Sequence, residues 1–270
     1  MLKKLEKSLS LDTDNLSLMN TYHQIFEQRG VLYNAAHAIC PESRRAEADA
    51  LLKWLRPRAY ETIAVIAAGG GFDACAISQH LHGKAKVICI EPSRSFSKMI
   101  PDHLDILNVP IHDIPLEDAS VDAVVNLATL HHVADRDRTF HEWDRLLKPG
   151  GRMIIGDVEK GSANAEFLNT AVDRYTPGGH KGDFLKPHEL TDYFNRLGYE
   201  QCQEDCESYT WRFESKERMS LFTMLLFGMV KADFKEIEQC LATHVGFRER
   251  SDGVTEFPWS LRFFSGIKVP

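Results

Sequence analysis

The sequence is poor in cysteine and has no long apolar run. Of its 270 residues six are cysteines, scattered along the chain: Cys40, Cys75, Cys89, Cys202, Cys206 and Cys240. A chain of this length does not need disulfides to fold, so we expect reduced thiols and a cytoplasmic protein. No segment approaches the roughly 18 apolar residues of a membrane span, and the first residues lack the apolar run of a secretory signal.

Basic residues are also in the minority. Lys and Arg total 32 against 39 Asp and Glu, which gives a formal net charge of −7. A nucleic-acid-binding protein is usually basic, so this balance favours a small molecule as the partner. There is no CxxC, HxxxH or HExxH pattern, so the motifs predict no metal site. Nothing in the composition indicates an oligomeric state.

The pattern of apolar residues predicts an α/β fold. Short unbroken apolar runs alternate with helical segments in the middle of the chain, which is typical of parallel strands buried on both faces. The expected strands are 62–67, 86–90, 105–111, 121–127 and 152–156, and the expected helices between them are 72–81, 93–100 and 136–147. Helix 136–147 is closed by the residues Lys148-Pro149-Gly150-Gly151.

Helical patterns flank this region on both sides. Helices are expected at 21–29, 31–39 and 43–55, and then at 164–174, 187–197 and 233–243, with a buried apolar helix near 219–229. Strands are expected from residue 199 and at 259–267. We predict a doubly wound, mostly parallel sheet of the seven-stranded type with an N-terminal helical cap, residues 1–58. The main domain is 59–270, with a C-terminal helical insertion around 214–245 and another insertion after 157.

A glycine-rich turn follows the first expected strand. The segment AAGGGFDA, residues 67–74, lets the backbone approach a ligand and opens a helix whose free N–H groups attract negative charge. We expect Gly69 and Gly71 to lie at the ligand. Glu91 ends the second strand, where a carboxylate can accept both hydroxyls of a ribose. These signals leave two cofactor types open, a nicotinamide dinucleotide and an adenosine-sulfonium cofactor.

The next segment distinguishes them. Residues 111–151, IHDIPLEDASVDAVVNLATLHHVADRDRTFHEWDRLLKPGG, closely resemble class I S-adenosylmethionine-dependent methyltransferases in the P-L-x-D-x-S-x-D linker, the L-H-H turn and the L-K-P-G-G helix end. The resemblance covers about residues 60–160. It implies S-adenosylmethionine as cofactor, with S-adenosylhomocysteine as product.

The resemblance also implies roles for particular residues. Glu91 would bind the ribose, with Pro92 beside the adenine. Asp113 would take the adenine amine, with Ile114 as its apolar neighbour. Asn126 and Leu127 would place backbone next to the methionine part of the cofactor.

One part of the motif departs from the family. An acid is usual where Val65 stands, and the first glycine of the turn is replaced by Ala67. The missing acid normally helps to organise the turn and the cofactor's amino group. Residues of the N-terminal helices are candidates to supply the missing group: Tyr22, Arg29, Tyr33 and Arg44.

Methyl transfer needs a general base only when the acceptor is protonated. Histidine titrates near neutral pH, so His131, in the L-H-H turn with His132, and His180, in the glycine-rich loop 176–183, are candidate bases. Tyr175 precedes this loop and is a candidate hydrogen-bond partner for the substrate. The candidate catalytic residues are therefore His131, Tyr175 and His180.

The leading function is therefore methyl transfer from S-adenosylmethionine to a small molecule. Two alternatives remain open. One is an intramolecular cyclase or lyase that acts on the same cofactor and releases methylthioadenosine. The other is a non-catalytic methyltransferase-like binding protein, which the loss of the acid at Val65 favours.

Overall fold

The fold is built on one sheet. A computed structural model describes residues 22–269, with side chains from residue 29 onward. The sheet has eight strands in this range: seven follow the order β3-β2-β1-β4-β5-β8-β6, and the short β7 pairs with β8. The strands are β1 (Thr62–Ile66), β2 (Lys86–Ile90), β3 (Asp105–Leu107), β4 (Val121–Leu127), β5 (Leu147–Asp157), β6 (Glu200–Phe213), β7 (Arg248–Glu249) and β8 (Thr255–Ile267). Strands β1 to β5 pair in parallel, and β8 runs antiparallel to β5 and β6.

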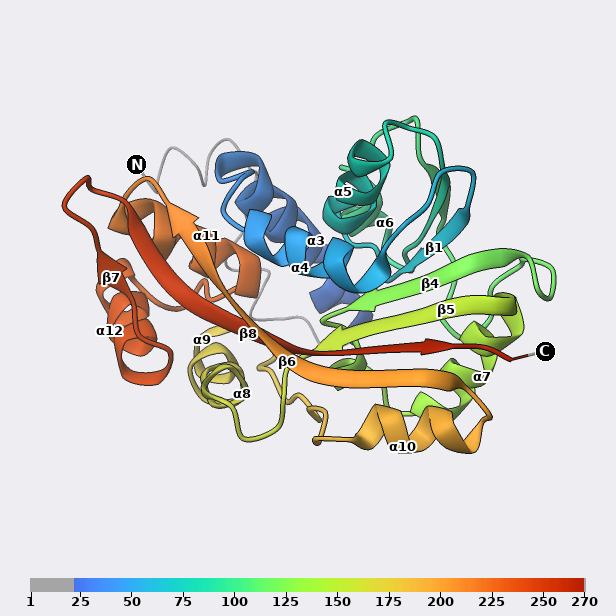
Figure 1. Ribbon diagram of the computed structural model, residues 1–270. Coiled ribbons are helices and arrows are strands. Elements are labelled where there is room, and N and C mark those ends of the chain that lie inside the picture. Colours follow the sequence, from blue (N-terminus) through green and yellow to red (C-terminus); the bar gives the residue numbers. More distant parts are fainter. Residues whose placement is uncertain (1–21, 270) are drawn as a thin grey trace.

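Both faces of the sheet carry a core, as a doubly wound fold requires. The helices around it are α3 (Tyr22–Ile39), α4 (Arg45–Leu55), α5 (Phe72–His80), α6 (Arg94–Ser97), α7 (Arg136–Leu146) and α10 (Glu189–Arg196). In β1 the side chains alternate: Ile63 and Val65 pack with apolar residues of α3, α4 and α5, whereas Ala64 and Ile66 pack with those of α7 and α10. Figure 1 shows α4 and α5 on one side of the sheet and α7 and α10 on the other. The predicted fold class is confirmed.

The first helix corrects a prediction. Two helices were expected, divided at Gly30, but α3 is continuous through it. A Cβ at Gly30 would lie 2.5 Å from Ser95 Oγ and 2.6 Å from the Phe96 backbone nitrogen, both in α6. The glycine therefore permits a close helix crossing rather than a break in the helix.

Further boundary errors are that the strand expected at 105–111 ends at Leu107, that the strand expected at 259–267 begins at Thr255, and that Lys148-Pro149-Gly150-Gly151 was assigned to the wrong element. These residues were expected to close a helix, but they lie in the first part of β5, whose N-terminal residue Leu147 pairs with Val121. The register shifts between Val121 and Ala123, and this irregularity accommodates the extra residues.

The C-terminal part of the chain extends beyond the parallel strands. We call residues 207–261 the C-terminal wall. β8 pairs with β5 only through Arg262–Ile267; its earlier residues pair with β6, and Thr255 and Glu256 also pair with β7. Figure 1 shows β6 and β8 extending together toward α11 (Lys216–Phe227) and α12 (Phe234–His244). Residues 219–227 of α11 are all buried. After β5 come α8 (Ala163–Phe167), a π-helical turn (Leu168–Val172) and α9 (Asp173–Tyr175). Within the described residues, no helix has both the length and the apolarity to cross a membrane.

Candidate functional site

A cavity of about 400 Å³ lies at the carboxyl ends of the parallel strands, where ligands bind in open α/β sheets. The helical cap, the sheet and the C-terminal wall all contribute to it. Its lining includes Arg29, Tyr33, Arg44, Glu47, Ala67, Ala68, Gly69, Asp73, Glu91, Pro92, Ser93, Phe96, Ile111, Leu127, Ala128, Thr129, His131, His132, Val158, His180, Trp211, Leu226, Phe227 and Trp259.

The glycine-rich turn has the backbone that its sequence predicts. Ala67, Gly69 and Gly71 all have positive φ, at 52°, 55° and 85°. Ala67 therefore holds a left-handed conformation that glycine would adopt without strain. A Cβ at Gly69 would lie 3.3 Å from the Tyr33 ring, so the cap approaches the turn closely at this point. Gly71 is the N-cap of α5 and does not line the cavity.

Glu91 is fixed at the end of β2. Its Oε2 accepts the Gly69 N–H at 2.8 Å and its Oε1 accepts the Ser93 N–H at 2.9 Å, and the residue is only 6% exposed. A carboxylate offers about four lone-pair sites, so it can accept hydroxyl donors as well as backbone N–H groups. Pro92 lies beside it in the lining.

Three residues implied by the resemblance lie elsewhere. Asp113 is exposed and Ile114 is buried in the core, with its N–H donating to Glu142 Oε1 at 2.7 Å. Asn126 is fully buried and donates to the Ile66 carbonyl at 3.0 Å, which ties β4 to β1 beside the turn. None of the three lines the cavity, whereas Leu127 and Ile111 do. Sequence reasoning missed Ile111, which carries no polar group to mark it.

Charged side chains gather where the cap meets the turn. Val65, which stands where an acid is usual, is buried in the core. Arg44 forms an ion pair with Glu47 and donates to Tyr33 Oη at 3.2 Å. Glu47 is 1% exposed and Arg44 6%. The guanidinium of Arg44 also lies over the rings of Phe72 and Trp211.

Two buried atoms in this group have no hydrogen-bond partner: Asp73 Oδ1 and Arg44 Nε. Burial, opposed by the charge of Arg44, raises the pKa of the Asp73 carboxyl to about 7. Sequence reasoning missed Asp73 and Glu47. Asp73 follows the glycine turn in the first turn of α5, and its position was the available signal. Tyr33, Arg29 and Arg44 line the cavity as proposed candidates, and the side chain of Tyr22 lies outside the described residues.

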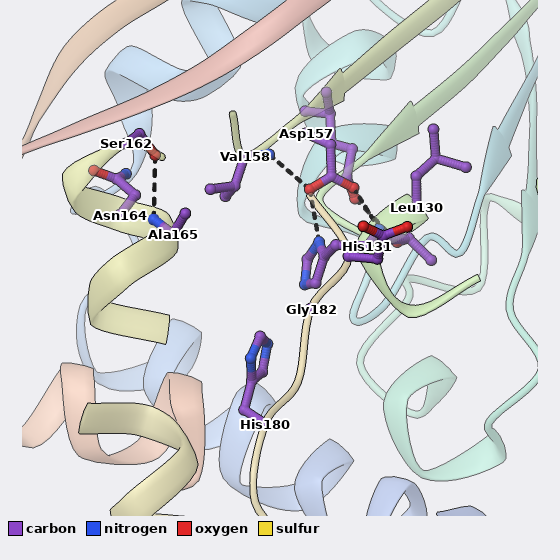
Figure 2. A network of polar contacts seen from close by, with 12 residues as sticks. Leu130, His131, Asp157, Val158, Ser162, Asn164, Ala165, His180 and Gly182 are labelled. Atoms are coloured by element: carbon purple, nitrogen blue, oxygen red, sulfur yellow. Dashed lines mark hydrogen bonds and ion pairs between the residues drawn. The ribbon is translucent and has the colours of Figure 1, made fainter. Parts of the chain in front are cut away.

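Three histidines meet at the other end of the cavity. His131 and His132 belong to a 3₁₀ turn (Leu130–His132) after β4, and His180 comes from the loop after α9. His131 Nδ1 lies 2.6 Å from Asp157 Oδ1, and the His131 N–H donates to Asp157 Oδ2 at 3.1 Å. Figure 2 shows Asp157 at the end of its strand beside the His131 ring, with the His180 ring on the far side.

The surroundings keep two of these rings neutral. Burial, reinforced by His131 and Arg29, lowers the pKa of His180 to about 3. Burial also lowers the pKa of His132 well below its ordinary value. Tyr175 is not part of this group, because its hydroxyl donates to Glu236 Oε1 at 3.1 Å and it does not line the cavity.

The comparisons with known proteins fit this geometry. The YcgJ protein of Bacillus subtilis has the same fold, with a TM-score of 0.59 and 18% identity over 84% of this chain and 99% of its own. Residues 65–155 match the family model described as a methyltransferase domain. Residues 65–155 are therefore a class I S-adenosylmethionine-dependent methyltransferase domain.

Two relatives are named as methyltransferases. A ubiquinone/menaquinone biosynthesis C-methyltransferase of Brucella anthropi is 26% identical over 61% of this chain and 65% of its own length. The 27-O-demethylrifamycin SV methyltransferase of Amycolatopsis mediterranei is 34% identical over 24% of each chain. The chain thus spans less than two thirds of either relative's length.

The family cofactor is S-adenosylmethionine, and the cavity fits it at two points. The Glu91 carboxylate and the close-approach turn at Gly69 suit a ribose. The unpartnered Asp73 and Arg44 atoms are one acceptor and one donor, which match the ammonium and carboxylate of a methionine. The residues present therefore fit the cofactor despite the loss of the acid at Val65.

Proposed function

We propose that this protein transfers a methyl group from S-adenosylmethionine to a small molecule. The observation that carries the proposal is the continuity of the cavity, which joins the Glu91 end to the histidine end. The cofactor supplies a methyl group on a positively charged sulfur, which is a good leaving group. The protein must therefore align the two reactants and exclude water.

Each end of the cavity has a separate task in this proposal. Glu91 and the turn at Gly69 hold the ribose. Asp73 accepts hydrogen bonds from the ammonium of the methionine part, and Arg44 donates from Nε to its carboxylate. Both atoms are buried and lack a protein partner, and such groups gain a charge-assisted hydrogen bond when the ligand binds.

Apart from its charged groups and histidines, the cavity is apolar and aromatic. Trp211, Phe227 and Trp259 line it, and all three are less than a tenth exposed. A pocket of this size and character is typical of small-molecule sites. The net charge of −7 and the names of the two relatives, which refer to a quinone pathway and a rifamycin, support the same substrate class. The six free cysteines support a reducing, cytoplasmic location.

A labelling experiment tests the proposal. The protein is incubated with methyl-labelled S-adenosylmethionine and a cell extract that has been divided by ultrafiltration. We expect S-adenosylhomocysteine and labelled product only with the small-molecule fraction. Label in the macromolecular fraction would contradict the substrate class. Methylthioadenosine formed without any extract would replace methyl transfer by intramolecular cyclisation, and failure to bind S-adenosylhomocysteine in calorimetry would leave only a non-catalytic protein.

A further inference from the structure

Three imidazoles converge on the acceptor end of the cavity. His131, His132 and His180 each offer one ring nitrogen, and these nitrogens all lie within 4.8 Å of one another. Ring centroids are 4.1 Å apart for His131 and His132, and 4.9 Å apart for His132 and His180. In a tetrahedral zinc site with bonds of about 2.0–2.1 Å the ligand nitrogens are about 3.3 Å apart, so small rotations of the side chains bring these three into range.

Two of the rings are oriented by a hydrogen bond on their Nδ1. His131 Nδ1 faces Asp157 Oδ1 at 2.6 Å, and His180 Nδ1 faces Asn169 Oδ1 at 3.2 Å. The Asn169 amide is itself fixed, because its Oδ1 accepts from the Gly182 N–H and its Nδ2 donates to the Gly182 carbonyl. Since both facing atoms are oxygen acceptors, each Nδ1 carries the hydrogen and each Nε2 carries the lone pair.

This is the arrangement of histidines that bind metals. A metal-ligating histidine usually donates its other N–H to a carboxylate or carbonyl oxygen, which fixes the tautomer and makes the ligand more basic. Asp157 is fully buried at the end of β5 and holds both the backbone and the ring of His131. Figure 2 shows the His180 ring on the side of His131 that faces away from Asp157.

We propose that His131, His132 and His180 bind a divalent transition-metal ion such as Zn²⁺, with a position left open for the methyl acceptor. Three protein nitrogens plus an exchangeable position are typical of catalytic rather than structural zinc sites. The three residues come from two distant segments, which is why no spacing motif predicted a metal.

The ion would select a class of acceptor. Arg29 lines the same cavity as the three histidines and Asp157 contacts the His131 ring, so the ion would lie near one positive and one negative protein charge. The net positive charge favours an anionic oxygen, such as that of a phenol, enol or carboxylic acid. On ligation the acceptor O–H bond breaks, the proton goes to solvent and the electron pair stays on oxygen. This role rests on the proposed methyl transfer, whereas the metal site does not.

Cobalt spectroscopy tests the site without any substrate. The full-length protein is treated with a chelator and titrated with Co²⁺, and the visible absorption of the bound ion is followed. We expect one equivalent to bind, to be displaced by Zn²⁺, and to lose at least tenfold in affinity in His132→Ala and His180→Ala. His103→Ala, an exposed histidine, is the control and should bind as the wild type does.

A cysteine substitution tests directly whether His180 is a metal ligand. His180→Cys should retain the ion and add a near-ultraviolet thiolate-to-cobalt band that the wild type lacks. The proposal is wrong if no saturable cobalt band appears, if His132→Ala and His180→Ala bind like the wild type, or if the wild type already shows the thiolate band, which would place the ion on cysteines. Binding of S-adenosylhomocysteine, measured separately, reports on the proposed function and on folding of each variant.

Discussion

At the scale of single residues, the cofactor end depends on two carboxylates in different surroundings. Glu91 accepts two backbone N–H groups, one on each oxygen. Asp73 has a buried oxygen without a partner, and burial raises its pKa. The first is suited to hold neutral hydroxyls and the second to gain a cationic partner.

Replacing Glu91 by Gln should weaken binding of S-adenosylhomocysteine by at least about tenfold, because hydrogen bonds to charged groups contribute about 1.5–3 kcal/mol. Titration calorimetry measures the affinity, and circular dichroism checks that the variant folds. Glu117→Gln, at an exposed position, is the matched control. Wild-type affinity in the Glu91→Gln variant would remove this residue from the site.

Asp73 predicts a pH dependence of cofactor binding. Its pKa of about 7 means that the carboxylate forms as pH rises through 7, and only the carboxylate attracts an ammonium. S-adenosylmethionine should therefore bind more tightly at pH 7.0 than at pH 5.5, an interval in which an α-amino group with an ordinary pKa of about 7.7–8.0 stays mostly protonated. Asp73→Asn should bind weakly and almost independently of pH in this interval, as measured by calorimetry at several pH values.

Asp73 should also make the cofactor-free protein less stable as pH rises. Because its pKa is higher in the folded protein than the ordinary 3.8, its contribution to stability is fully present below pH 3.8 and is lost as pH rises through 7. Without cofactor, Asp73→Asn should thus be more stable than the wild type at pH 7.5 in urea unfolding. Lower stability together with unchanged affinity would show that Asp73 has a purely structural role.

At the scale of elements, the close approach of Gly30 to α6 predicts how a substitution there changes the free energy of unfolding. In an ordinary helix, Gly→Ala stabilises by about 0.5–1 kcal/mol. Here the added Cβ would meet Ser95 and the backbone of α6, so Gly30→Ala should lower the free energy of unfolding by about 1–3 kcal/mol. The control Ala38→Gly, exposed on the same helix, should cost only its helix propensity. Stabilisation by Gly30→Ala in urea unfolding would mean that α3 does not cross α6 so closely.

The elements show what the sequence can and cannot predict. Strands β1, β2 and β4 were predicted almost to the residue because their unbroken apolar runs reflect burial on both faces. The break predicted at Gly30 was wrong, because a local pattern cannot distinguish a helix break from a close contact with α6, a helix distant in the sequence. Glu91 could be predicted because it directly follows a strand. Asp73, Glu47 and the meeting of His180 with His131 depend on packing between distant segments, which one sequence does not reveal.

At the scale of the whole molecule, the cavity joins three parts of the chain. Tyr33 and Arg44 come from the cap, Glu91 from the sheet, and Leu226 and Phe227 from α11. Tyr33 contacts Phe96 in α6, and His37 of the same helix contacts Phe222 in α11. The cap is therefore packed between the sheet and the C-terminal wall, and a ligand that contacts all three should couple their stabilities.

Hydrogen exchange tests this coupling. A ligand present at 100 times its Kd stabilises the folded state by about 2.7 kcal/mol, and amides that exchange only by global opening should slow accordingly. With S-adenosylhomocysteine we expect slower exchange in β1 and β2, and also in residues 30–39 of α3 and in α11, which both contribute to the cavity lining. Because α10 packs on the other face of the sheet, any protection there must come from global opening alone. If only the sheet were protected, the cap and the wall would open independently of the bound ligand, and the cavity would not act as a single closed site.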